Sequence, residues 1–223
     1  MPTWPSYSPR DFLMFGPEVY WRLFELQNRA LWPLPVLAGG AGVACLLLVI
    51  SGRGPALRGA VVLLAVACLG AAYFLAARYA PINWPAGHAA WGLAAQAGLL
   101  ALVAVAGRPE LAGSGRRFAS LPGWGLLALA TALYPALGLS AGRPLAQAEI
   151  FGLAPDPTAI ACLGLASLVA ARRHAIALAV IPALWCGASA ATLLTLGEAQ
   201  GWVPLAALAL WGSGVAAALL QRR

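Results

Sequence analysis

The sequence predicts an all-α integral membrane protein, a bundle of seven transmembrane helices with an N-terminal amphipathic interfacial helix. Three observations lead to this fold class. The 223 residues are 61% hydrophobic and 9% charged, with a mean hydropathy of +0.80, and so few charges cannot cover the surface of a soluble domain. The apolar residues come in blocks of about 18–22, the length that crosses a bilayer as a helix. The connections are short, which makes successive helices antiparallel neighbours.

Residues 1–30 are predicted to form the N-terminal interfacial segment, ahead of a transmembrane bundle over residues 31–223. Gly16-Pro17 breaks the chain, and Pro17 suits the first position of a helix. Charged residues then recur along one helical face, at Glu18, Arg22, Glu25 and Arg29. The aromatic and aliphatic residues lie away from this charged stripe. The segment is therefore expected to lie in the membrane interface or to lead into the first span.

Seven candidate spans follow, at roughly 31–50, 58–79, 88–107, 119–139, 157–171, 175–196 and 202–220. The fifth has only about 15 residues, so it is either tilted less than its neighbours or flanked by a thinned or protein-covered region. If this fifth span does not cross the membrane, the number of spans falls to six and the orientation of the second half is lost.

The basic residues predict the orientation. All 14 are arginines, and a seven-span arrangement puts nine of them on one side and five on the other. The positive-inside rule then places the N-terminus outside and the C-terminus in the cytoplasm. The Arg-only, Ala-, Leu- and Gly-rich composition indicates a bacterial inner-membrane protein. The arginines lie at segment ends, where they meet lipid headgroups, and no basic stripe with interleaved aromatics suggests nucleic-acid binding.

The segments on the predicted outer side mix aromatic, acidic and amide side chains, as functional loops do. They are FGPEVYWRLFELQNR, PINWPAGH, GRPLAQAEIFGLAPDPT and GEAQGW. We expect a ligand-binding site on this face. Its predicted residues are Glu18, Arg22, Glu25, Asn83, Arg143, Glu149 and Asp156.

Three of these residues have a structural interpretation beside the functional one. Asp156 precedes Pro157, the pattern of an N-cap followed by proline at the first helical position, or it binds a cation or solute. Glu149, near Arg143, is placed either to bind a polar solute or to form a salt bridge that holds the loop. Asn83 adjoins Trp84, which is expected to be an interfacial anchor.

Other reactive side chains favour packing over chemistry. His88 and His174 fall at opposite membrane faces and cannot ligate one haem or metal ion. The cysteines lie in four different spans without a CxxC motif and are expected to be packing residues, with a disulfide or metal pair as the alternative. No nucleophile, phosphate-binding or zinc motif is present. We therefore expect no catalytic residue and no metal, and the sequence leaves any cofactor unknown. The alternative is an enzyme in which Glu149, Asp156 and His88 converge on the outer face.

Several of these segments are similar to those of one protein family. YWRLFELQNRALWP, PINW, GRPLAQAEIFGLAPDPTAIA and IPALWCGASAATL carry the similarity, and AEIFGLAPDPTAI (148–160) is its most specific part. The chain resembles, from about residue 9 to residue 196, an uncharacterised family of small multi-pass bacterial inner-membrane proteins, some of which carry a permease-like label. The resemblance implies a helical membrane protein and carries over no catalytic residues.

The expected function is that of a small inner-membrane permease-like or solute-binding protein with an outer-facing polar site. The alternative is a non-catalytic accessory or scaffold subunit of a larger membrane complex. It is supported by the absence of central charges in the spans and by abundant small-residue faces. Expected partners are membrane lipid and other membrane proteins or further copies of this chain. A charged stripe turned inward onto loop 143–156 favours a site, and one turned outward favours a partner.

Overall fold

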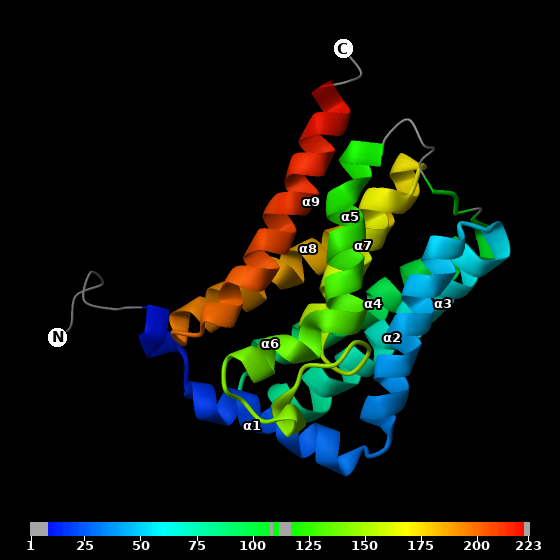
Figure 1. The fold of residues 1–223 in the computed structure, drawn as a ribbon. Helices are drawn as coiled ribbons and strands as arrows, with labels where there is room; N and C mark the ends of the chain where they lie inside the picture. Colours follow the sequence, from blue (N-terminus) through cyan, green and yellow to red (C-terminus); the bar gives the residue numbers. More distant parts are fainter. Residues whose placement is uncertain (1–8, 108, 112–116, 221–223) are drawn as a thin grey trace.

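The computed structural model describes residues 9–107, 109–111 and 117–220, which form an all-α bundle (Figure 1). The α-helices are α1 (Pro17–Ala30), α2 (Leu34–Ser51), α3 (Gly54–Phe74), α4 (Pro85–Ala106), α5 (Arg117–Ala128), α6 (Tyr134–Ser140), α7 (Pro155–Leu168), α8 (Arg172–Thr195) and α9 (Trp202–Leu220). A π-helical segment, Leu75–Tyr79, extends α3, and another, Leu129–Leu133, joins α5 to α6. Short 3-10 turns occupy Pro9–Phe12, Leu145–Gln147 and Ala199–Gly201.

Within the described residues, five helices are long and apolar enough to cross a membrane, as judged by length and composition. They are Leu34–Ser51, Gly54–Tyr79, Pro85–Ala106, Leu121–Ser140 and Arg173–Thr195. These match the first four predicted spans and the sixth, and they make the chain a multi-pass membrane protein. The other two predicted spans coincide with α7 and α9, which are not among the five.

Helix α1 lies across one end of the bundle (Figure 1). Its first residue is Pro17, in keeping with the preference of proline for the start of a helix. An aromatic face turns inward, and Phe24 stacks on Phe74 of α3 with ring centroids 4.5 Å apart. Tyr20 packs edge-on against Tyr79, at 5.8 Å. These rings fix α1 to the end of α3.

Two buried amide side chains also fix α1, to the loop between α6 and α7. Gln27 donates a 2.8 Å hydrogen bond to the carbonyl oxygen of Leu153. Asn28 donates to the carbonyl oxygens of Ala146 and Ala148, at 3.0 and 2.9 Å. Buried carbonyl groups need such donors, because each unpaired one costs free energy. Helix α1 is therefore a structural cover of this loop.

Helix α7 occupies the centre of the bundle, where it contacts α3, α5, α8 and α9 (Figure 1). Every one of its 14 residues except Ser167 is buried. Such a helix is about 21 Å long, shorter than the roughly 30 Å hydrocarbon core of a bilayer. The preceding loop is partly buried as well, with Ala148, Phe151 and Leu153 in the interior. Irregular backbone at this depth is tolerated because protein covers it.

The loop reaches the bundle interior through a close approach to α3. Gly152 turns the chain in a left-handed conformation, with φ of +79°, and its N–H donates to the Thr158 hydroxyl at 3.0 Å. Its carbonyl oxygen occupies the place where a Cβ at Gly70 would lie. A glycine at position 70 is therefore what admits this turn against α3.

We expect Gly70→Ala to destabilise the protein by about 1–3 kcal/mol, because the added methyl overlaps backbone that cannot retreat without moving the loop. Gly59→Ala, on the same helix, is the control. Its methyl would meet only the Leu48 side chain, at 3.5 Å, and alanine should gain up to about 1 kcal/mol in a helix. Thermal unfolding of the detergent-solubilised protein measures both, and equal shifts would contradict the close-approach argument.

Candidate functional site

Asp156 is fully buried near the start of α7, with an exposed fraction of 0%. The N-cap interpretation of this residue is wrong. Helix α7 begins at Pro155, Ala154 holds the cap position in an extended conformation, and no side chain caps the helix. Either proline of the PDP sequence suits a first helical position, and the helix begins at the earlier one. The Asp156 carboxylate therefore does not cap α7, and it binds side chains of other helices.

Three donors from other helices converge on this carboxylate. Trp185 Nε1 donates to Oδ1 at 2.7 Å, the Ser189 hydroxyl to Oδ2 at 2.7 Å, and the Tyr134 hydroxyl to Oδ2 at 3.4 Å. Trp185 and Ser189 lie four residues apart on α8 and so share one face. Hydrogen bonds to a carboxylate are strong, and together they compensate part of the cost of burying it.

A second polar cluster holds the ends of the α6–α7 and α8–α9 connections together. Arg143 forms a 3.3 Å ion pair with Glu198, and its guanidinium lies 3.6 Å from the centroid of the Trp21 ring. Gln200 accepts a hydrogen bond from Arg143 and donates one to Glu149. Arg143 therefore pairs with Glu198 and reaches Glu149 through Gln200, so the predicted loop salt bridge has a different acidic partner.

Glu149 is buried, and burial raises the pKa of its carboxyl well above the usual range. The negative charge of Asp156 raises this pKa further, whereas Arg143 and the Gln200 hydrogen bond oppose the shift. Glu149 Oε1 is buried and has no hydrogen-bond partner among the described residues. A raised pKa at a buried carboxyl is a common property of functional sites and also occurs in structural networks.

The charged stripe of α1 faces away from these clusters. Glu18, Arg22 and Arg29 are exposed, and Arg22 and Arg29 form ion pairs with Glu25 at 2.6 and 2.7 Å. Gln147 also donates to Glu25, at 3.2 Å. The hydrogen bonds from Arg22 and then Gln147 hold the pKa of Glu25 below its usual value. The stripe is therefore divided: Glu18, Arg22 and Arg29 face outward, which by the sequence criterion favours a partner, whereas Glu25 is buried and contacts loop 143–156, which favours a site.

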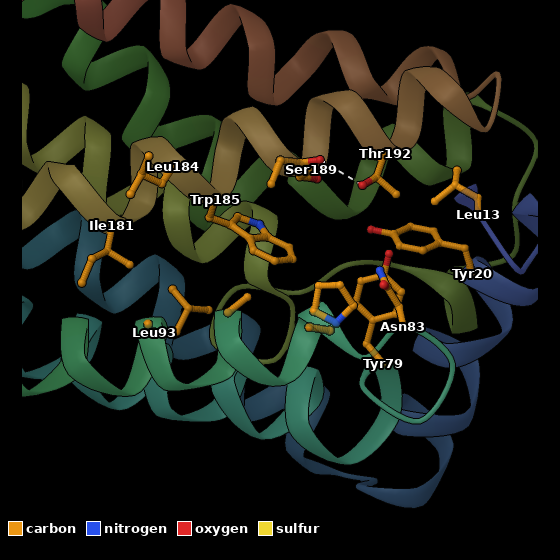
Figure 2. A pocket seen from close by; sticks show the side chains of 15 residues that line it. Leu13, Tyr20, Tyr79, Asn83, Leu93, Ile181, Leu184, Trp185, Ser189 and Thr192 are labelled. Atoms are coloured by element: carbon orange, nitrogen blue, oxygen red, sulfur yellow. Dashed lines mark hydrogen bonds between the residues drawn. The ribbon is translucent and has the colours of Figure 1, made fainter. Parts of the chain in front are cut away.

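A cavity of about 530 Å³ lies beside Asp156, between α4 and α8 (Figure 2). Trp185 and Ser189 both line this cavity and bind Asp156, so they separate the carboxylate from the empty space. Asn83 lines the same cavity, with Tyr20 and Tyr79. Of the seven predicted site residues, Asn83 alone reaches the cavity wall.

The structure thus divides the predicted site residues into groups. Arg143 and Glu149 share one network through Gln200, and Asp156 is close enough to raise the Glu149 pKa. Glu18, Arg22 and Glu25 stay on α1, outside that network. Among the described residues, no group of three or more His, Cys, Asp or Glu side chains is arranged to hold a metal ion.

Sequence reasoning missed the residues that surround the carboxylates. They are Tyr134, Trp185, Ser189, Glu198 and Gln200. The GEAQGW segment was an available signal for the last two, since its mixture of side chains is not that of a plain turn. The spacing of Trp185 and Ser189 predicts a shared face, but nothing in the sequence indicates that this face meets Asp156.

The family model described as "Family of unknown function (DUF6064)" matches residues 17–217, which include all the residues of both clusters. No curated protein and no solved structure matches the chain.

We expect Asp156→Ala to lower the free energy of unfolding by about 3 kcal/mol, because it leaves three donors without their acceptor. A lost N-cap would cost only about 1 kcal/mol. Asp156→Asn keeps an acceptor oxygen and should stay within about 1 kcal/mol of the wild type. Thermal unfolding of the three proteins tests this, and an Ala variant as stable as the Asn variant would show that the network is not holding α6, α7 and α8 together.

Glu149→Gln should change how stability depends on pH. The folded-state pKa of Glu149 is raised, so the wild type is most stable below the ordinary carboxyl pKa and loses stability as pH rises through the raised value. The Gln variant lacks this loss, and its melting temperature should exceed that of the wild type increasingly as the pH rises above the ordinary carboxyl pKa of about 4.3. Glu18→Gln, at an exposed position, is the control. Parallel pH profiles for the wild type and Glu149→Gln would disprove the assignment.

Proposed function

We propose a solute-binding or permease-like role for this chain, which belongs to the family of unknown function DUF6064 and is a multi-pass membrane protein. The observation that carries the proposal is the buried Asp156 carboxylate, joined to a cavity by Trp185 and Ser189. A carboxylate in a membrane-spanning bundle is costly, and intramembrane ionisable groups typically mark substrate or ion pathways.

The short helix α7, which follows a loop in the bundle interior, supports this role. It begins inside the bundle after a partly buried loop, and Asp156 lies in its first turn. Many transporters bind substrates at broken helices, where the positive end of the helix dipole and freed backbone groups are available. The π-helical segment Leu129–Leu133, directly before Tyr134, is a further irregularity next to the same carboxylate.

We propose seven membrane crossings, with α7 forming the short fifth crossing and α9 forming the seventh. The N-terminus would face outward and the C-terminus the cytoplasm of a bacterial inner membrane. Arg143 and the segment Leu75–Tyr79 both contact α1, consistent with one outer end of the bundle. Four arginines used in the orientation argument lie outside the described residues: Arg108, Arg116, Arg222 and Arg223. Residues 1–8 of the N-terminal segment lie outside them as well.

The alternative, an accessory or scaffold subunit, has one observation in its favour. The charged stripe of α1 is exposed at Glu18, Arg22 and Arg29 and forms no part of the buried clusters. An exposed stripe of both signs can pair with a partner protein or with lipid headgroups. The two roles predict different molecules that co-purify with the protein: a small-molecule ligand for the permease-like role, and partner chains for the accessory subunit.

Native mass spectrometry of gently extracted protein distinguishes these roles. We expect the wild type to carry a reproducible small-molecule adduct, which Ala188→Phe removes by filling the cavity. Ala191→Phe is the matched control, because Ala191 is also an exposed alanine of α8 but does not line the cavity. Stoichiometric partner chains without an adduct would favour the accessory subunit, and an adduct that survives Ala188→Phe would remove the cavity from the proposal.

A further inference from the structure

The cavity between α4 and α8 has two chemically different ends. Leu93, Ile181 and Leu184 line one end, and Tyr20, Tyr79 and Asn83 line the other, near α1 (Figure 2). The ring of Trp185 lies between them (Figure 2). A ligand that fits both ends has an apolar body and a small polar head.

The cavity opens on the flank of the bundle. Leu184 lines it and is 71% exposed, and Ala188, one turn further along α8, lines it and is exposed too. Both α4 and α8 are candidate membrane spans. An opening between two spans faces hydrocarbon, so molecules that already dissolve in the bilayer reach it without crossing water.

The polar end contains a hydroxyl group that is not satisfied within the protein. Tyr79 is only 4% exposed, lines the cavity, and its hydroxyl has no hydrogen-bond partner of normal geometry among the described residues. Asn83 is the side chain that can interact with this hydroxyl, although no hydrogen bond of normal geometry joins the two. A buried donor left unpaired costs free energy, and a ligand oxygen that accepts from it would recover that cost.

The described part of the cavity wall carries no charged side chain, since every polar residue in it is a tyrosine, tryptophan, asparagine, serine or threonine. Asp156 lies behind Trp185 and Ser189 and already accepts three hydrogen bonds. Arg143 is engaged by Glu198 and Gln200. An ionised head placed here would be desolvated without a counter-ion, which is strongly unfavourable.

We propose that this cavity binds an uncharged amphiphile from the lipid phase, whose head oxygen accepts the Tyr79 hydroxyl hydrogen bond and whose apolar body lies along α8. The inference rests on the proposed function, in that it names the class of ligand for the same cavity. Ordinary acyl chains also fill grooves on membrane proteins, and recognition of the head distinguishes the proposed ligand from them.

Three probes with one common chain test the class of ligand: oleyl alcohol, which is uncharged, oleylamine, which is cationic, and oleate, which is anionic. Native mass spectrometry titrations of the detergent-solubilised full chain measure their affinities. We expect oleyl alcohol to bind about tenfold more tightly than either charged probe, because only its head avoids an unpaired buried charge. Equal binding of all three, or tighter binding of oleylamine or oleate, would overturn the proposal.

The head contact is tested by Tyr79→Phe, with Tyr73→Phe as control. Tyr73 lies on the same helix but is 50% exposed and does not line the cavity. Tyr79→Phe should weaken oleyl alcohol binding roughly five- to tenfold, the worth of one hydrogen bond. It should leave the ligand-free melting temperature unchanged or higher, because an unpaired buried hydroxyl is removed. Unaltered affinity in Tyr79→Phe would overturn the assigned head contact.

Failure of this inference differs from failure of the proposed function. If none of the oleyl probes binds but an adduct from the native membrane is lost in Ala188→Phe and kept in Ala191→Phe, the cavity is a site and the ligand class is wrong. If the two alanine variants behave alike with the native adduct and with oleyl alcohol, both proposals fail.

Discussion

The structure depends on satisfying an irregular stretch of backbone inside a bundle of membrane-crossing helices. An unpaired backbone group in hydrocarbon costs several kcal/mol, and the loop before α7 is partly buried. Gln27 and Asn28 of α1 donate to three carbonyl groups of this loop, and Thr158 accepts the N–H of Gly152. The interfacial helix is therefore part of the bundle, and without it the short central helix would begin from an unsatisfied loop.

This same segment creates the polar centre. Because α7 begins inside the protein, Asp156 emerges between α6 and α8, which supply Tyr134, Trp185 and Ser189 as donors. Two of those donors also form part of the cavity wall. Trp185 and Ser189 therefore contact both the carboxylate of α7 and the space between α4 and α8.

The charged residues of the loops and the residues that line the cavity form separate groups. Arg143, Glu198 and Gln200 tie two connections together beneath α1 and leave little open to water. The open space is bounded instead by hydroxyl, amide and aromatic groups. A sequence search for charges finds the first set because charges are rare in a membrane protein. It passes over the second because tyrosine, serine and tryptophan are ordinary packing residues in spans.

The sequence by itself determined the membrane class, the positions of five long apolar helices and the start of a helix at Pro17, because length, hydropathy and proline placement are local properties. Only the tertiary structure decided that α7 begins at Pro155, that Arg143 pairs with Glu198, and that Trp185 and Ser189 face Asp156. These outcomes depend on how each helix is rotated about its axis. Helices rich in Ala, Leu and Gly are apolar on every side, so their sequences do not encode that rotation, and packing between distant segments sets it.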